Sequence, residues 1–290
     1  FSNIVIRRVP GVGFTLNNSV GETFDKPAVI ISNHQSHLDL MCLLMLSEKM
    51  VVITNDWVWH NPIYGALIRR AEFIPAAEGV DRYMPQLRSL VERGYSIVVF
   101  PEGTRSEDCS IMRFHKGAFH IAQELGLDIV PVCLHGIGHV LPKNDFMLRP
   151  GHIAVKVGRR IEAGDMSWGS DARERTKAFH RFYIDWYAQM CRECESAGYW
   201  KQYIRHQYMY KGLDIYRSCM RSLDCLQELH AADGETALGV TDCGQGEQSL
   251  LTALQNPETE VTGYVADEET LLLASSLAGK PDNLKFELKR

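Results

Sequence analysis

Short apolar runs alternate with amphipathic stretches across residues 28–195. The runs are rich in β-branched residues and end at polar residues, glycine or proline, which is typical of buried strands. The stretches between them place apolar residues at helical spacing: Tyr83, Leu87 and Leu90 form one such stripe, and Gly94 ends it. This alternation predicts an α/β fold with a largely parallel sheet flanked by helices. The expected strands are residues 28–31, 50–53, 96–100, 129–134 and 153–157, and the expected helices are residues 36–47, 60–70, 81–93, 115–125 and 171–195.

Two polar segments follow expected strands directly. Residues 33–39 read NHQSHLD and residues 100–106 read FPEGTRS. In open parallel sheets, ligands bind beyond the carboxyl ends of the strands. The two segments are therefore expected to meet at one edge of the sheet and to form a catalytic centre there.

The first segment places His34 at the strand exit and Asp39 five positions later. A histidine near neutrality can take a proton from a hydroxyl, and a nearby carboxylate can hold its tautomer and stabilise the cation. Two other interpretations remain open, since Asn33 and Ser36 are also good helix-entry residues. The segment could be a polar helix cap with surface histidines. It could also be a metal site that includes His37, although the spacing does not fit a dinuclear hydrolase.

The second segment combines a flexible turn with a cation. Gly103 allows the backbone to approach a ligand closely, and the guanidinium of Arg105 offers paired donors that fit a phosphate. A tight turn with a surface salt bridge is the simpler alternative. A covalent serine route is disfavoured because the segment around Ser96 fails the G-x-S-x-G pattern at its last position.

Several ordered motifs point to one family. These are Asn33, His34, Ser36 and Asp39 in the first segment, residues 100–106, the FHKGAF run of residues 114–119, and the IVPV run of residues 129–132. Over residues 1–190 the chain closely resembles the glycerolipid acyltransferases, such as the 1-acyl-sn-glycerol-3-phosphate acyltransferases. The fold expected from this resemblance is an acyltransferase-type α/β domain.

The resemblance also implies roles for the matching residues. His34 would be the general base and Asp39 its orienting carboxylate, while Glu102, Gly103, Thr104 and Arg105 would bind the acceptor. The expected enzyme is an O-acyltransferase of phospholipid biosynthesis that moves a fatty acyl group to a lysolipid hydroxyl, with a lysophosphatidic acid-like acceptor. Acyl-CoA or acyl carrier protein would be the co-substrate, with no tightly bound cofactor, no metal and no covalent intermediate. The alternative is a non-catalytic lipid-binding or scaffold module of a larger lipid-handling membrane protein.

The chain departs from the family pattern at one position. Ala76 stands where the middle motif of the family usually carries an arginine, and Arg69 or Arg70 would have to substitute for it. The identity of the acceptor is therefore open.

Beyond the acyltransferase-like region, residues 191–233 are expected to form an aromatic and basic helical connector. Its residues 199–211 mix tyrosines and a tryptophan with cations, as in segments that touch a membrane surface, or as in a packed helix. The aromatic residues 57–64 allow the same two interpretations.

Residues 234–290 alternate strands and helices around a glycine turn. They resemble the opening of class I S-adenosylmethionine-dependent methyltransferases, since Asp242, Gly244 and Gly246 match the first part of that family's loop. Glu247, Gln248 and Val265 depart from the pattern. The expected unit is a partial, Rossmann-like one, truncated or degenerate, in which methyl transfer is not expected.

Composition excludes several classes. The formal net charge of -5 argues against a nucleic-acid partner. The 8 scattered cysteines fit a reducing compartment better than a disulfide framework, and Cys191 with Cys194 is expected to occupy helix positions and not a metal site. Without a long apolar run, and with Phe1 at the start, the sequence suggests a piece of a longer chain held at the cytoplasmic face of a membrane.

Overall fold

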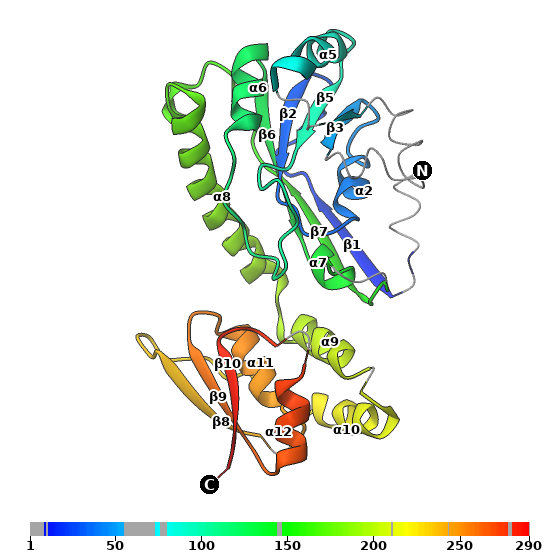
Figure 1. The fold of residues 1–290 in the computed structure, drawn as a ribbon, viewed down its shortest axis with the longest axis vertical. Coiled ribbons are helices and arrows are strands. Elements are labelled where there is room, and N and C mark those ends of the chain that lie inside the picture. Colours follow the sequence, from blue (N-terminus) through cyan, green and yellow to red (C-terminus); the bar gives the residue numbers. More distant parts are fainter. Residues whose placement is uncertain are drawn as a thin grey trace. The chain divides into compact units, whose positions relative to one another are not determined.

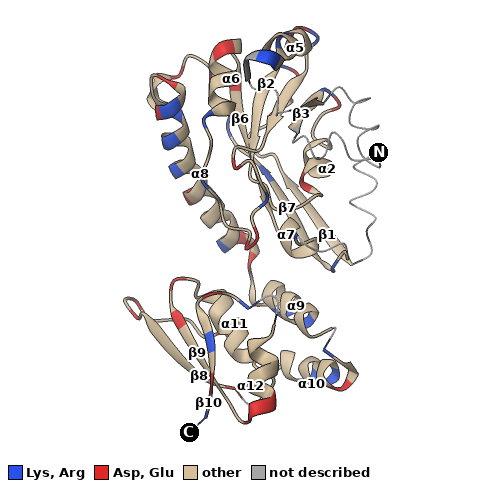
Figure 2. Ribbon diagram, viewed as in Figure 1, with Lys and Arg blue, Asp and Glu red and all other residues tan. Residues whose placement is uncertain are grey.

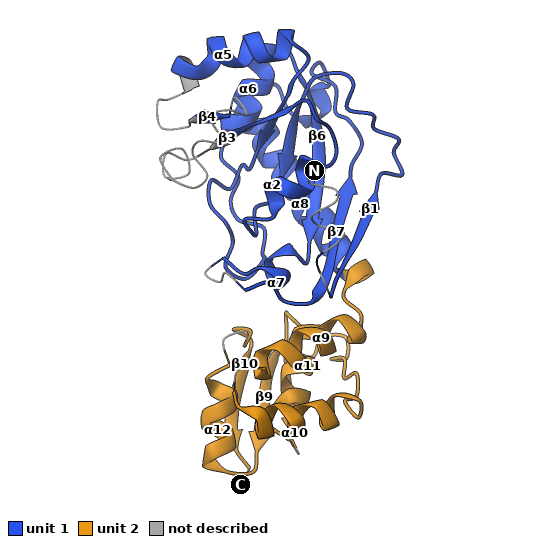
Figure 3. Ribbon diagram, turned by 90° about the vertical axis from the view of Figure 1, so that its right-hand side faces the viewer, with its two compact units in different colours: residues 1–191 blue, residues 192–290 orange. Residues whose placement is uncertain are grey.

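The computed structural model describes residues 9, 11–54, 73–75, 80–143, 147–209, 211–242, 244–277 and 280–289. The chain forms two compact units, residues 1–191 and residues 192–290 (Figure 3). Each unit has its own buried cluster of apolar side chains. Residues of both charge signs are spread over both units, so the net negative charge does not come from one acidic block (Figure 2).

The first unit is built on a seven-stranded sheet with the order β1-β7-β6-β2-β5-β3-β4. Neighbouring strands run parallel except β6 and β7, which are antiparallel. Its strands are β1 (Val12–Asn17), β2 (Ala28–Ser32), β3 (Met50–Thr54), β4 (Ile74–Pro75), β5 (Ser96–Val99), β6 (Asp128–His135) and β7 (Gly151–Val157). Its helices are α2 (Asp39–Leu43), α5 (Val80–Glu92), α6 (Gly117–Leu125), α7 (Ile137–Val140), the 3-10 turn η2 (Met166–Trp168) and α8 (Ala172–Cys194).

Burial explains why the central strands read as continuous apolar runs. Every residue of β2 and β6 is buried, because helices cover both faces of the sheet. In Figures 1 and 3, α2 and α8 lie on opposite faces. Alternate residues of β2 serve the two faces: Ala28 and Ile30 belong to the apolar cluster that contains Cys42 and Leu43 of α2.

Most of the expected elements of the first unit are present. The helix expected over residues 36–47 is shorter, because the backbone from Asn33 to Ser36 is irregular and its N–H groups bond to side chains. The expected helix at residues 60–70 and the aromatic residues 57–64 lie outside the described residues, as do Arg69, Arg70 and Ala76. No helix among the described residues is long and apolar enough to span a bilayer.

The second unit contains α9 (Ala197–Tyr208), α10 (Leu213–Leu223), β8 (Ala237–Thr241), α11 (Glu247–Gln255), β9 (Glu260–Val265), α12 (Glu268–Ser275) and β10 (Leu284–Leu288). Its three strands are parallel in the order β10-β9-β8. The segment expected to be a separate connector is part of this unit. Trp200, Ile204 and Tyr208 of α9 are buried in its apolar cluster, so the side chains of Trp200 and Tyr208 belong to the core of this unit.

Candidate active site

The two polar segments meet beyond the carboxyl ends of β2 and β5, which are neighbours in the sheet. The ring of His34 stacks on that of Phe100, with centroids 4.2 Å apart and an interplanar angle of 18°. The backbone N–H of His34 donates to Glu102 Oε1 at 2.9 Å, and its carbonyl accepts from the Ser106 N–H at 2.8 Å. The second segment therefore contacts His34 at its ring, its backbone N–H and its backbone carbonyl.

His34 and Asp39 form the expected pair. His34 Nδ1 lies 2.7 Å from Asp39 Oδ2; the histidine side chain is 24% exposed and the aspartate side chain is fully buried. The same oxygen accepts the backbone N–H groups of Gln35 at 2.6 Å and Ser36 at 2.9 Å. These donors hold the carboxylate in place. Because Nδ1 is engaged with Asp39, Nε2 is the ring nitrogen left to accept a proton.

His37 has a different setting. The residue is exposed. Partial desolvation of its ring, and then the charges of Arg105 and His34, lower the pKa of its imidazole against the opposing effect of Asp39. Within the part of the chain that the structure describes, His34, His37 and Asp39 do not form a three-ligand group that could hold a metal ion.

Glu102 was predicted to bind the acceptor, and its carboxylate is engaged by other parts of the protein. The residue is 3% exposed, and its second oxygen accepts the Met112 N–H at 3.1 Å. Burial raises the pKa of Glu102 to about 7, against the opposing effect of its bonds to the His34 and Met112 N–H groups. Through these contacts Glu102 connects the backbone of the His34 loop to that of Met112. Direct acceptor binding by this side chain would require both bonds to open.

The other residues predicted to bind the acceptor lie in the turn above Glu102. Gly103 has φ of 73°, a left-handed conformation that favours glycine, and both Gly103 and Thr104 are exposed. Arg105 is half-buried and donates from Nη1 to the Lys143 carbonyl at 2.9 Å. Burial lowers the pKa of this guanidinium, while Asp39 acts in the opposite direction, so Arg105 is a partly desolvated cation beside the His34–Asp39 pair.

Sequence reasoning missed two supports of this site. Tyr183 and Tyr187 of α8 hydrogen-bond to the residues on either side of His34. The available signal was weak, because the tyrosines fit the apolar stripe of a packed helix and lie far from the motifs in sequence. Cys191 and Cys194 lie at the end of the same helix, which confirms their predicted helix positions.

Comparison with known proteins finds matches within the first unit. Residues 14–135 match the family model described as Acyltransferase. The 1-acyl-sn-glycerol-3-phosphate acyltransferase of Chlamydomonas reinhardtii is 35% identical over 143 residues, which cover 47% of this chain and 43% of that protein. The 1-acyl-sn-glycerol-3-phosphate acyltransferase of Limnanthes douglasii is 32% identical over 181 residues, covering 59% of this chain and 63% of that protein. The chain thus spans less than two thirds of the length of these relatives.

A solved structure shares the fold. The crystal structure of the 1-acyl-sn-glycerophosphate acyltransferase PlsC from Thermotoga maritima superposes with a TM-score of 0.55 at 22% identity, covering 62% of this chain and 72% of that one. The family match and the sequence relatives support an O-acyltransferase domain in the first unit, and the solved structure supports its fold. The family match ends at residue 135 and gives no support to the methyltransferase resemblance of residues 234–290.

Proposed function

We propose that the protein is an O-acyltransferase that transfers a fatty acyl group from a thioester to the hydroxyl of a lysolipid. The observation that carries the proposal is the His34–Asp39 pair, with a fixed carboxylate on Nδ1 and a partly exposed ring. His34 Nε2 takes the hydroxyl proton as the oxygen attacks the thioester carbonyl. The carbon–sulfur bond then breaks, and the leaving thiolate takes the proton back from His34. General-base catalysis of this kind contributes about 10²–10⁴-fold.

The proposed acceptor is lysophosphatidic acid or a similar anionic lysolipid. The names of the relatives favour this acceptor, and the exposed Gly103–Thr104 turn with the partly desolvated Arg105 offers donors for a phosphate beside His34. The acceptor is a membrane lipid, so we place the reaction at a membrane surface, on its cytoplasmic face. The donor is acyl-CoA or acyl carrier protein, and the two are distinguished by supplying each separately.

The test is transfer of a radiolabelled acyl group from acyl-CoA to lysophosphatidic acid. Replacing His34 by alanine should abolish transfer while leaving the circular dichroism spectrum unchanged. His37→Ala is the matched control, since His37 lies in the same loop without the Asp39 contact, and its loss should be milder. Full activity of His34→Ala would overturn the mechanism, and equal losses in both variants would reopen a metal-dependent route. Lipid binding without turnover by the unaltered protein would favour the scaffold alternative.

We also propose that the second unit binds a nucleoside ligand of the S-adenosylmethionine kind without turning it over. The parallel β8-α11-β9-α12-β10 order and a cavity of about 470 Å³ beside Asp242, Gly244 and Glu247 favour a small-molecule site. Isothermal titration of the full chain with S-adenosylmethionine should show saturable binding. Absence of binding would leave this unit a structural module.

A further inference from the structure

Three consecutive residues of the catalytic loop each bond to a different side chain, of which those of Tyr183 and Glu102 are buried and that of Tyr187 is half-buried. Asn33 is held by Tyr183, His34 by Glu102, and Gln35 by Tyr187. Two of these supports come from α8, which lies outside the residues matched by the family model.

The contacts of Tyr183 are the more extensive. Its fully buried hydroxyl accepts the Asn33 N–H at 3.0 Å and lies 2.9 Å from Asn33 Oδ1 and 2.6 Å from the Val132 carbonyl. The Asn33 side chain in turn bonds both the N–H and the carbonyl of Leu134, each at 2.8 Å. The exit of β2 is therefore locked to β6 through this tyrosine. Without the hydroxyl, the buried Asn33 N–H has no acceptor.

Tyr187 holds the other side of His34. Its hydroxyl accepts from Gln35 Nε2 at 2.7 Å, and the same amide nitrogen donates to the Cys109 carbonyl at 2.9 Å. The two tyrosines are four residues apart on a helix, a rise of about 6 Å. Asn33 and Gln35 are two residues apart, a span of at most about 7 Å. Two tyrosines about one helical turn apart can therefore hold Asn33 through its backbone N–H and Gln35 through its side chain.

We propose that Tyr183 and Tyr187 are positioning residues for His34, acting through Asn33 and Gln35. The helix then sets the register of the loop so that Nδ1 faces Asp39 and the ring stays stacked on Phe100. This inference rests on the proposed function for its kinetic consequence. Its structural consequence, the orientation of the His34 ring, can be measured without turnover.

The test uses Tyr183→Phe and Tyr187→Phe in the full chain, with Met190→Ala as the matched control. Met190 is 2% exposed on the same helix, so its truncation weakens packing without removing a hydrogen bond to the loop. In Tyr183→Phe we expect kcat to fall about 10–100-fold with the KM for lysophosphatidic acid unchanged, as for a small misplacement of a catalytic group. Tyr187→Phe should have a smaller effect, because Gln35 keeps its bond to Cys109. Met190→Ala should lower the melting temperature and leave kcat unchanged.

Nuclear magnetic resonance of the histidine rings gives the second readout. Because the His34 ring stacks on Phe100, a change in its orientation should displace its ring resonance, which is identified by its loss in His34→Ala. The displacement is expected in Tyr183→Phe and not in Met190→Ala. If the unaltered protein transfers no acyl group, the proposed function fails and the resonance still decides the inference. The inference is overturned if the His34 resonance of Tyr183→Phe does not move. It is also overturned if kcat falls in proportion to the loss of melting temperature in all three variants, Met190→Ala included. If Tyr183→Phe does not fold, Tyr187→Phe carries the same comparison.

Discussion

At the scale of single residues, His34 is held by neighbours that the motif alone does not explain. The motif predicts the pairing with Asp39, and the structure adds the Phe100 stack and the bond from its N–H to Glu102. Acceptor binding by Glu102 stays a prediction. Its buried carboxylate accepts the N–H groups of His34 and Met112, and these contacts are not encoded in the motif.

Glu102 also makes the stability of the first unit depend on pH. Burial raises the pKa of Glu102 to about 7, whereas the pKa of a glutamate in an unfolded chain is about 4.3. Between these values the folded state binds more protons than the unfolded state, so this group lowers stability as pH rises from about 4.3 to about 7. The effect should be on the order of 1–3 kcal/mol.

Glu102→Gln cannot ionise, so its stability should change less over the same pH range. The measurement is the melting temperature of the first unit at a series of pH values, for the unaltered protein and for the variant. If the melting temperatures of the two proteins differ by the same amount at every pH, the pKa of Glu102 is not raised in the folded state.

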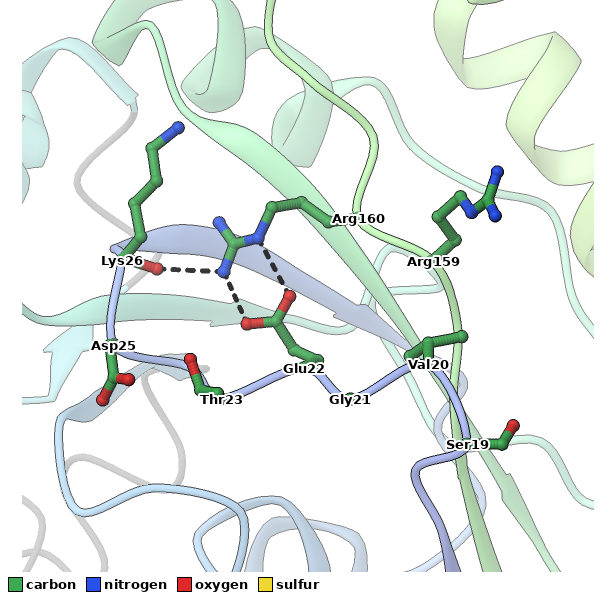
Figure 4. A pocket seen from close by; sticks show the side chains of 9 residues that line it. All are labelled: Ser19, Val20, Gly21, Glu22, Thr23, Asp25, Lys26, Arg159 and Arg160. Carbon is green, nitrogen blue, oxygen red and sulfur yellow. Dashed lines mark hydrogen bonds and ion pairs between the residues drawn. The ribbon is translucent and has the colours of Figure 1, made fainter.

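At the scale of elements, the opposite edge of the sheet carries a separate ion-pair network. A cavity of about 610 Å³ opens there, lined in part by Lys26, Arg159 and Arg160 (Figure 4). Arg160 donates to both oxygens of Glu22, at 2.7 Å and 2.9 Å, and to Asp128 Oδ2 at 3.3 Å. Asp128 begins β6, and Arg160 follows β7, so the network joins the β1–β2 connection to two strands. The cavity lies at the amino ends of β2 and β6, away from His34, and its paired charges fit a structural role.

We expect Arg160→Met to destabilise the first unit by about 1–3 kcal/mol at neutral pH, because it leaves the Glu22 carboxylate, only 8% exposed, without its main partner. The hydrogen bonds from Arg160 lower the pKa of Glu22 against the effect of burial. Burial alone would raise the pKa of Asp128, but bonds from Lys26, the Ala163 N–H and Arg160 outweigh it. A carboxylate whose pKa is lower in the folded than in the unfolded state stabilises the folded state at pH values above its unfolded pKa of about 4. This stabilisation is lost as the pH falls through the folded pKa.

The difference between Arg160→Met and the unaltered protein should therefore shrink in acid, when urea unfolding is followed at several pH values. Arg159→Met is the matched control. Its side chain is exposed and points away from Glu22, so little change is expected (Figure 4). A constant difference at all pH values would show that Arg160 acts through packing alone.

The elements also show what periodicity can and cannot predict. Strands β2, β3, β5, β6 and β7 and helices α5, α6 and α8 follow from apolar runs and helical stripes, because each is covered by other elements. Strand β1 was missed, since its burial is low along most of its length and its sequence VGFTLN carries no continuous apolar run. Helix α2 is shorter than its pattern, because Asp39 draws the Gln35 and Ser36 N–H groups to its side chain. The tyrosines of α8 reach the site only through the tertiary fold, which no local pattern encodes.

At the scale of the whole molecule, the two units should be separable. The apolar cluster that includes β2, β6 and β7 draws all its residues from the first unit, and the cluster around α9, α11 and β9 draws all of its residues from the second. The described residues of the proposed site all belong to the first unit: His34, Asp39, residues 102–105 and the tyrosines of α8.

A protein ending at Ser196, after α8, should therefore keep its fold and its acyl transfer. The measurement compares kcat and melting temperature for residues 1–196 and for the full chain. If the shortened chain folds with an unchanged melting temperature but loses kcat, the second unit takes part in the reaction. Unchanged values of both leave acyl transfer to the first unit alone, and any ligand of the second unit must then act independently of His34.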